Sequence, residues 1–351
     1  MKRIGNYTLE LENHPYLEAF GAVGGKKEKE GPLGEYFDKC FIDTTLGQDT
    51  WEQSESKLQT EASQLVLEKG SLTQNDIQYV FSGDLLNQCI SSTFGLRTLN
   101  IPFLGQFGAC STMGQALAMA SIFVESGAAD RAMAVTSSHF CSAERQFRFP
   151  LEYGGQRTPT AQWTVTGAGA VIVAGQDVPS KQMTTVYPGV TKPKRVTVSH
   201  ITVGRITDLG VKDANNMGAA MAPAAAQTIA DYLEDTNTSP QDYDLILTGD
   251  LGQVGSELLE KLLRENGIFI GENHNDCGLL IYDRQKQDVH AGGSGCGCAA
   301  SVSCIKLFPE MAEGLYHNVL FVPTGALMSP TSSQQGASIP SIAHLVHLTA
   351  E

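Results

Sequence analysis

Two long stretches of the chain repeat the same order of features, and this repeat constrains the fold more than any other part of the sequence. Residues 61–85 and 224–251 each run from an Ala- and Gln-containing helical pattern through a polar turn to an apolar strand pattern. Both strand patterns end in Gly-Asp-Leu, which gives Asp84 and Asp250 equivalent positions. The spacing between the two stretches is too long for a solenoid. The repeat therefore indicates two copies of one α/β unit that face each other across a pseudo-twofold axis.

Helical and strand patterns also alternate between and around the two repeats. Residues 57–69 carry one apolar helical face, residues 112–126 form an apolar helical pattern, and residues 130–138 are patterned as a buried strand. This alternation predicts helices packed on a largely parallel or mixed sheet. We expect an N-terminal half over residues 1–176 and a C-terminal half over residues 177–351.

The overall charge and the cysteine pattern exclude several classes of protein. A formal net charge of −14 argues against a general nucleic-acid binder, because phosphate recognition needs a basic surface. The charge run at residues 26–30 is bracketed by glycines and predicts a solvated loop. The eight cysteines are scattered along the chain, and the N-terminal residues lack the apolar core of a signal peptide. Both features favour reduced thiols in a cytosolic compartment. No stretch approaches the ~20 apolar residues that span a bilayer.

Several segments resemble the thiolase-like superfamily of thiolases and ketoacyl-ACP synthases. In the first half they are "GACSTMGQALAMASIFVESGAADRAMAVTSS" and "TGAGAVIVAG", and in the second half "DYDLILTGDLGQVG" and "HAGGSGCGCAASV". With residues 16–41 included, the full-length pattern is most similar to the AD family of stage V sporulation proteins from spore-forming bacteria. The resemblance implies an α/β protein with a five-layered αβαβα fold made of two duplicated halves. It also implies a role in the uptake of dipicolinic acid into the developing spore.

The resemblance places Cys110 where thiolase-like enzymes carry their nucleophilic cysteine, at the N-terminus of a buried helix. Backbone N–H groups and the helix dipole favour a thiolate at such a position. From the residue type alone, a buried structural cysteine is the alternative, because cysteine also packs as a small apolar side chain. We therefore expect Cys110 at the former active centre, and its location there does not by itself establish activity.

Acyl condensation also needs donors for the developing oxyanion, and the resemblance implies that this chain has lost them. The histidine position of the family corresponds to Gly249 or Asp250, and its asparagine position aligns best with Cys296. The sequence therefore predicts a protein that binds a ligand without catalysis. The alternative is an acyl-transferring enzyme that uses the helix-end thiol together with His290 and a second cysteine, Cys296 or Cys298. A structural adaptor with a vestigial pocket is a third possibility.

The resemblance implies a planar dicarboxylate as the ligand, either dipicolinic acid or its calcium chelate. A helix N-terminus attracts anions, and arginine forms paired hydrogen bonds with carboxylates. The predicted ligand-binding residues are Cys110, Ser111, Met113, His139, Arg145, Arg148, Asn216, Met217, Asp250 and Cys296. Taken singly, Arg145 fits a surface position equally well, and His139 fits a core position equally well.

We expect no cofactor and no metal site. The Cys-x-Cys spacing that begins at Cys296 differs from the usual zinc-binding pair, and no basic cluster suits the phosphates of coenzyme A. The resemblance implies a homodimer through the first-half sheet and contact with other stage V sporulation membrane proteins. The expected location is that of a cytoplasmic-type soluble protein held at the spore inner membrane by those partners.

Overall fold

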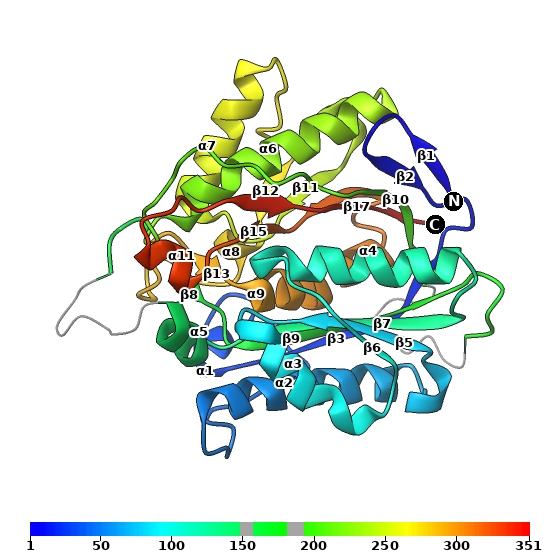
Figure 1. Ribbon diagram of the computed structural model, residues 1–351. Coiled ribbons are helices and arrows are strands. Elements are labelled where there is room, and N and C mark those ends of the chain that lie inside the picture. Colours follow the sequence, from blue (N-terminus) through cyan, green and yellow to red (C-terminus); the bar gives the residue numbers. More distant parts are fainter. Residues whose placement is uncertain (148–156, 181–192) are drawn as a thin grey trace.

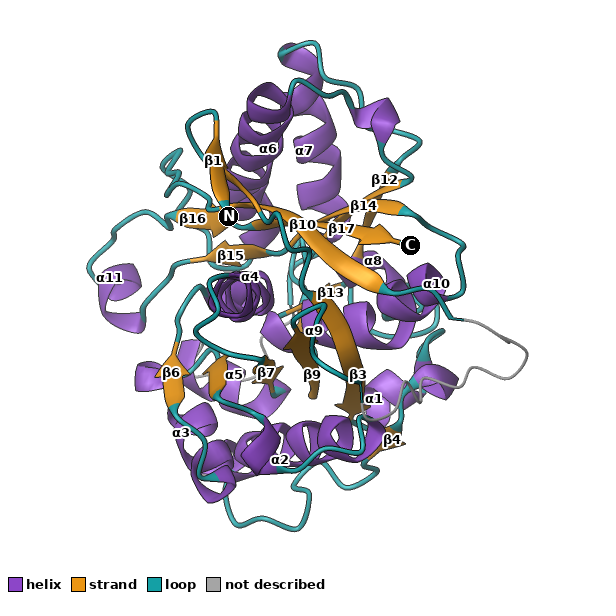
Figure 2. Cartoon of the chain, turned by 90° about the vertical axis from the view of Figure 1, so that its right-hand side faces the viewer, coloured by secondary structure: helices purple, strands orange, loops and turns teal. Residues whose placement is uncertain are grey.

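The protein is built of five layers in which helices and sheets alternate (Figure 1). The computed structural model describes residues 1–147, 157–180 and 193–351. One outer layer holds α2 (Trp51–Lys69) and α3 (Ile90–Leu96), and the other holds α6 (Met217–Thr236) and α7 (Gly252–Glu265). The central layer holds α4 (Thr112–Glu125) and α9 (Cys296–Val302). Figure 2 shows α4 end-on between the two sheets. The αβαβα prediction is confirmed.

The two halves have the same strand order, which supports the duplication predicted from the repeat. The order is β6-β5-β7-β9-β3 in the first half and β12-β11-β14-β17-β10 in the second. In each half the first three strands of this order are parallel, and the remaining pairs are antiparallel. The first set comprises β3 (Tyr16–Gly24), β5 (Tyr79–Gly83), β6 (Phe103–Gly105), β7 (Arg131–Ser138) and β9 (Gly167–Ala174). The second comprises β10 (Val196–Thr202), β11 (Leu245–Thr248), β12 (His274–Asp276), β14 (Asn318–Val322) and β17 (Leu345–Ala350).

The central layer explains why α4 and α9 are rich in small residues. A helix that lies between two sheets must bury all its sides, and bulky side chains would hold the sheets apart. Ala116 and Ala120 of α4 are fully buried, as are Ala299 and Ala300 of α9. On the neighbouring sheet, a Cβ added at Gly169 would lie 2.4 Å from the Ala300 carbonyl oxygen. The close approach of α9 to the first-half sheet therefore depends on glycine at that position.

The outer helix α2 shows how local sequence signals set an element. The Thr50 hydroxyl accepts a hydrogen bond from the Gln53 N–H and caps the N-terminus. Leu58, Ala62 and Val66 then lie on one face and are fully buried against the first-half sheet. The predicted helix over 57–69 is correct, and the helix begins earlier than predicted, at Trp51.

The two halves meet at strands β3 and β10, where Tyr16 pairs with Thr197. The N-terminal hairpin of β1 (Lys2–Ile4) and β2 (Thr8–Glu10) then adds to β10 rather than to the first-half sheet. The first residues of the chain thus pack with the second half, while the boundary between residues 176 and 177 stays a prediction.

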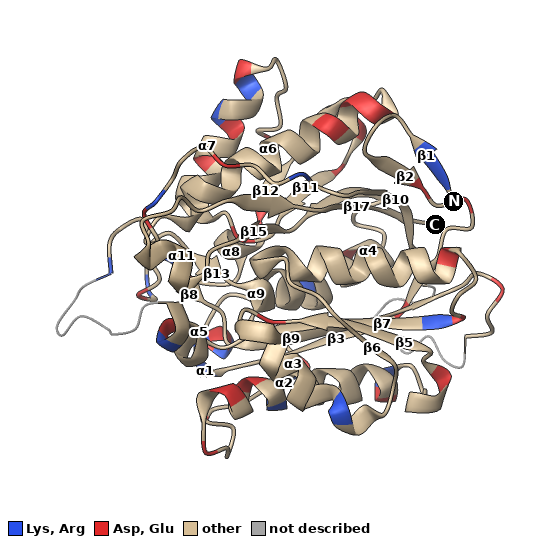
Figure 3. Ribbon diagram, in the orientation of Figure 1, with Lys and Arg blue, Asp and Glu red and all other residues tan. Residues whose placement is uncertain are grey.

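Charged residues lie mainly on the outer layers. Figure 3 shows acidic and basic segments mixed along α2 and α7 and acidic segments alone on α6, whereas α4 is almost uncharged. One charged residue departs from the sequence prediction: Glu28 of α1 (Lys26–Lys29) is fully buried instead of solvated. Its carboxyl accepts hydrogen bonds from the Thr166 N–H and from the Tyr282 hydroxyl, and burial raises its pKa. None of the helices in the described segments combines the length and apolar character that a membrane-spanning helix needs.

Candidate functional site

Cys110 sits on a short 3-10 turn (Ala109–Ser111) that leads directly into α4. Ala109 has a φ of +49°, in the left-handed region that a residue with a Cβ adopts only where its surroundings enforce it. Strand β15 (Thr324–Ala326) supplies that constraint, because a Cβ at Gly325 would lie 2.1 Å from the Gly108 carbonyl oxygen. Close packing between the halves therefore holds the turn and aims the thiol.

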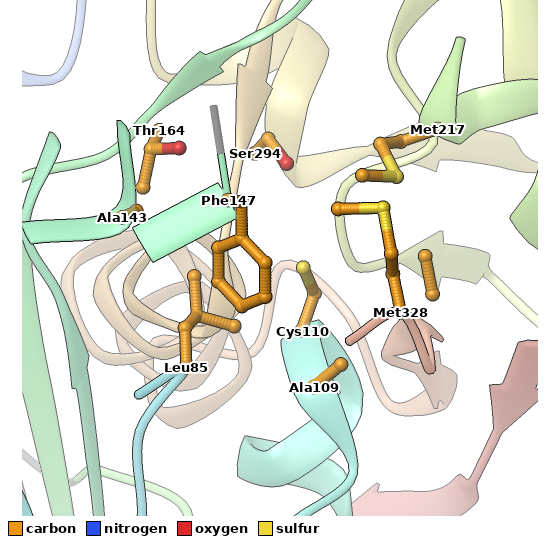
Figure 4. A pocket seen from close by; sticks show the side chains of 10 residues that line it. Leu85, Ala109, Cys110, Ala143, Phe147, Thr164, Met217, Ser294 and Met328 are labelled. Carbon is orange, nitrogen blue, oxygen red and sulfur yellow. The ribbon is translucent and has the colours of Figure 1, made fainter. Parts of the chain in front are cut away.

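A cavity of about 50 Å³ opens next to the Cys110 thiol, enough for roughly three or four water molecules. Figure 4 shows the sulfur pointing into it, with Leu85 and Phe147 on one side and Met217 and Met328 on the other. Its polar lining comes from Thr164 and Ser294. The remaining lining residues of the described chain are Ala109, Ala143 and Ala326. The walls are thus largely apolar, and the described lining carries neither Lys nor Arg.

Asp250 is the ionisable group that contacts the thiol. Its carboxylate faces the Cys110 thiol and accepts hydrogen bonds from the Gly295 N–H at 2.8 Å and from the Thr324 hydroxyl at 3.0 Å. The Ser294 hydroxyl donates to the same carboxylate at 3.1 Å. Burial raises the pKa of Asp250 to about 6, although these hydrogen bonds favour the charged form. Near neutral pH the thiol therefore faces a carboxylate.

Burial and the facing carboxylate also determine the state of Cys110 itself. Burial raises the pKa of the Cys110 thiol well above its usual range, and the charge of Asp250 raises it further. The Gly295 N–H acts in the opposite direction but does not offset these effects. The helix N-terminus alone would favour a thiolate, yet in this environment the neutral thiol is the stable form.

Two further buried carboxyl groups, those of Glu55 and Asp84, lie in the first half. Glu55 of α2 accepts hydrogen bonds from the hydroxyls of Ser137 and Ser142, and the Asp84 carboxylate accepts from the N–H and the hydroxyl of Ser92. Burial raises the pKa of both carboxyls. Asp84 and Asp250, the repeated Gly-Asp-Leu residues, thus occupy buried, hydrogen-bonded positions just after β5 and β11.

The structure brings three of the predicted site residues together: Cys110, Asp250 and Cys296. Cys296 begins α9 as Cys110 precedes α4, and the two cysteines belong to one buried cluster with Leu85, Ala109 and Ala143. The Cys296 thiol donates a hydrogen bond to the Ser137 carbonyl oxygen at 2.8 Å. Of the predicted ligand-binding residues, Cys110 and Met217 line the cavity, whereas Asp250 and Cys296 are not among its lining residues.

The other predicted residues contact the protein and do not line the cavity. The Ser111 hydroxyl donates to the Gly108 carbonyl oxygen, and Met113 is fully buried in the central core. Asn216 caps α6 by accepting from the Ala219 N–H.

The two predicted residues at and within α5 (Phe140–Phe147) also have protein partners. The ring of His139 bonds the Thr44 carbonyl oxygen, and the exposed Arg145 pairs with Glu52 at 2.9 Å. His139 is therefore a core residue and Arg145 a surface residue, as the alternatives for each allowed. Arg148 lies outside the described residues.

Several cavity residues were not singled out from the sequence. Leu85 follows the repeated Gly-Asp pair, and Ser294 belongs to the glycine run after His290, so both had a local signal. Phe147, Ala326 and Met328 had none, because their place at the cavity depends on how distant segments pack. The residues that hold Asp250, namely Ser294, Gly295 and Thr324, belong to the same half but lie 44 to 74 residues further along the chain.

Of the residues considered for a thiolase-type site, Cys296 shares a buried cluster with Cys110, whereas His290 does not reach the cavity beside the thiol. The His290 ring pairs with Asp288 at 2.9 Å, and His290 does not line the cavity. Cys298 is fully buried, and burial raises its pKa well above the usual range. Within residues 1–147, 157–180 and 193–351, no group of three or more His, Cys, Asp or Glu side chains is arranged to hold a metal ion.

The fold has many solved relatives of low sequence identity. A 3-oxoacyl-[acyl-carrier-protein] synthase III from Aquifex aeolicus superposes with a TM-score of 0.56 at 14% identity, over 95% of this chain and 99% of that one. A human mitochondrial 3-ketoacyl-CoA thiolase in complex with CoA gives 0.58 at 13% identity, over 98% and 99%. The cerulenin-bound OleA protein of Xanthomonas campestris gives 0.58 at 12% identity, over 96% of each chain. These likenesses establish the thiolase-like fold.

Sequence comparison is more specific. The family profile described as "Stage V sporulation protein AD (SpoVAD)" matches residues 5–349. The stage V sporulation protein AD of Bacillus subtilis (strain 168) is 46% identical over 344 residues, which cover 98% of this chain and 97% of that protein. With its thiolase-like layers and this match along nearly its whole length, the chain belongs to the stage V sporulation protein AD family.

Proposed function

We propose that this protein binds dipicolinic acid, free or as its calcium chelate, for uptake into the developing spore, and that it does so without catalysis. The observation that carries the proposal is the contact between Cys110 and Asp250. At this position a carboxylate faces a neutral thiol beside an apolar cavity. Membership of the sporulation family supports the biological setting.

The Asp250 carboxylate opposes acyl-transfer chemistry for electrostatic reasons. A thioester-forming step needs a thiolate, and the neighbouring negative charge disfavours one. Asp250 would also repel an oxyanion that developed near Cys110. The loss of a single oxyanion-hole donor already lowers an enzyme's rate by ~10²–10³-fold, and a carboxylate near the oxyanion opposes the reaction further. The cavity lining that the structure describes contains no imidazole to take the thiol proton.

The cavity walls favour a flat, largely apolar ligand face with few polar contacts. Leu85, Phe147, Met217 and Met328 supply contact surface for a ring, and the hydroxyls of Thr164 and Ser294 supply polar contacts. A free dicarboxylate carries two negative charges, which the described lining does not neutralise. The calcium chelate is neutral in a one-to-one complex, and it therefore suits a site next to Asp250 better than the free dianion.

The cavity must widen to accept such a ligand, because a ring with two carboxyl groups is larger than three or four water molecules. Met217 and Met328 face each other on one wall (Figure 4). Methionine side chains are unbranched and adapt their shape readily, so rotation of these two is the simplest way to enlarge the space.

Calorimetry with dipicolinate in the presence and absence of calcium tests this function, with benzoate and isophthalate as comparison ligands. We expect saturable binding of dipicolinate that is tighter with calcium and much weaker for the comparison acids. Ala326→Phe fills the cavity and should abolish binding, whereas Ala337→Phe makes the same change at an exposed position and should not. Absence of saturable binding would refute the proposal.

A second assay separates binding from the enzymatic alternative. The protein is incubated with acetyl-coenzyme A, and its intact mass is measured over time. We expect no acyl adduct on Cys110, and we expect Cys110→Ala to retain dipicolinate binding because the thiol contributes little more than its small volume. An adduct on Cys110 that forms and turns over would instead support the acyl-transferring enzyme.

We also propose that a second copy of the chain covers the edge of the first-half sheet. Strand β6 ends that sheet, and all three of its residues are exposed. Phe103, Leu104 and the nearby Phe107 and Phe94 are large exposed apolar residues along this edge, which is unusual for a free edge strand. Contact with other stage V sporulation membrane proteins is part of the same proposal, and family membership is its support.

A further inference from the structure

A cluster of cations lies on the side of a two-stranded ribbon opposite the cavity. The ribbon pairs β8 (Trp163–Thr164) with β13 (Gly293–Ser294). Thr164 and Ser294 line the cavity, and successive strand residues point to opposite faces, so the Trp163 ring lies on the outer side. In Figure 1 the ribbon lies close to α5. The outer face of the ribbon is therefore a separate place from the Cys110 cavity.

The Trp163 ring is held between a ring and two cations. Phe140 of α5 stacks on it with a centroid distance of 3.8 Å and an interplanar angle of 7°. The Lys27 ammonium lies 4.0 Å from the centroid of the Trp163 ring, and the Arg157 guanidinium carbon lies 4.6 Å from it. Because Phe140 covers one face, both cations share the other face. Two like charges are thus brought together over one aromatic ring.

Asp288, Glu28 and Glu30 lie near the Lys27 ammonium, yet none of them forms an ion pair with it in the described chain. Asp288 pairs with Arg157 at 3.1 Å and with the His290 ring at 2.9 Å, and its side chain is 76% exposed. No described residue forms a hydrogen bond or ion pair with the Lys27 ammonium. One guanidinium nitrogen of Arg157, Nη1, is buried and also has no hydrogen-bond partner in the described chain. A buried, unpartnered donor beside such an ammonium is costly unless a ligand meets both.

We propose that Lys27 and Arg157 form a binding site for the carboxylate of a small anion, separate from the Cys110 cavity. The site rests on two unused donors, the Lys27 ammonium and Nη1 of Arg157, which lie over the same aromatic ring. The carboxylate accepts hydrogen bonds from the Lys27 ammonium and from the free Nη1 of Arg157, both charge-assisted. Both cations contact one face of the Trp163 ring, and Phe140 stacks on the opposite face and fixes the orientation of the Trp163 ring. The site goes beyond the proposed function, since it does not depend on what the Cys110 cavity binds.

Trp163 provides a direct readout, because the chain contains two tryptophans, Trp51 and Trp163. In a Trp51→Phe background, the emission of Trp163 is recorded while dipicolinate is added as the carboxylate probe. We expect a saturable change. Lys27→Gln and Arg157→Gln should each raise the half-saturation concentration by roughly tenfold or more, as expected for lost hydrogen bonds between charged groups. The charge-conserving Lys27→Arg should keep the binding, and so should Lys29→Gln, which removes an exposed charge on the same helix.

Three further outcomes decide the proposal. Retention of the Trp163 response in Ala326→Phe supports a site apart from the cavity, whatever becomes of the proposed function. A response that disappears in Ala326→Phe but survives in Lys27→Gln would overturn it, since the signal would then come from the cavity. Equal saturation by inorganic phosphate would overturn the assignment to carboxylates, and absence of any saturable change would overturn the site.

Discussion

Replacement of Asp250 by asparagine should reduce the dependence of stability on pH. Burial raises the pKa of Asp250 from 3.8 to about 6 in the folded chain. A shift of about two pH units corresponds to roughly 3 kcal/mol between the two protonation states. Because the folded pKa is the higher one, the folded state binds the proton more tightly than the unfolded chain does. The stabilisation is therefore complete below pH 3.8 and is lost as the pH rises through about 6.

The assay is urea unfolding followed by circular dichroism at a series of pH values from about 4 to about 8, the range over which the shifted pKa acts. The free energy of unfolding of the wild type should fall by about 3 kcal/mol more across this range than that of Asp250→Asn. Asp276, whose pKa is raised to about 7 mainly by burial, contributes to the fall in both proteins. The charge of Asp250 also raises the pKa of Asp276, so Asp250→Asn should lessen the fall due to Asp276 and widen the difference in the same direction. Asp177→Asn, at an exposed position, serves as the control and should follow the wild type. Parallel curves for wild type and Asp250→Asn would show that this carboxyl is not buried as described.

Three other predictions concern the thiol, the sheet edge and a buried ion pair. At about pH 8, near the pKa of a free thiol, Cys110 should react with iodoacetamide far more slowly than a free cysteine does, because burial and Asp250 raise the pKa of the thiol. Mass spectrometry of the labelled peptide measures the rate, and fast labelling would contradict the prediction. Leu104→Asp should shift the protein toward monomer in sedimentation velocity if a second copy covers β6, whereas an unchanged sedimentation coefficient would exclude that edge as the interface. Glu18→Ala should lower the free energy of unfolding by about 3–5 kcal/mol, since it leaves Arg131 buried without the carboxylate that it contacts at 2.5 Å; a loss below about 1 kcal/mol would show that water reaches the pair.

The layered fold was predictable because its signals are local and repeated. The hydrophobic pattern of the sequence predicts the apolar faces of α2 and α4 and the apolar strands β5 and β11. The repeat shows which elements of the two halves are equivalent. The resemblance to thiolase-like proteins located Cys110, Asp250 and Cys296, and the repeat independently marked Asp250.

Side-chain partners were the part that the sequence did not determine. The direction of Arg145 depends on Glu52 of another helix, and the place of His139 depends on a carbonyl in a distant loop. The charged run predicts a solvated Glu28, yet its burial follows from contact with Tyr282, which lies far along the chain in the second half. The first two contacts form within the first half between segments that are distant along the chain, and the Glu28 contact forms only when the halves pack. A pattern along the chain therefore does not predict them.

A crystal structure of the protein soaked with calcium dipicolinate tests the central claim most directly. We predict ligand density in a widened cavity beside Cys110, with Met217 and Met328 rotated away and no bond between the ligand and the sulfur. Density for the ligand only elsewhere on the molecule, with this cavity unchanged, would contradict the account. A covalent acyl group on the Cys110 sulfur, after exposure of the same crystals to an acyl thioester, would contradict it equally.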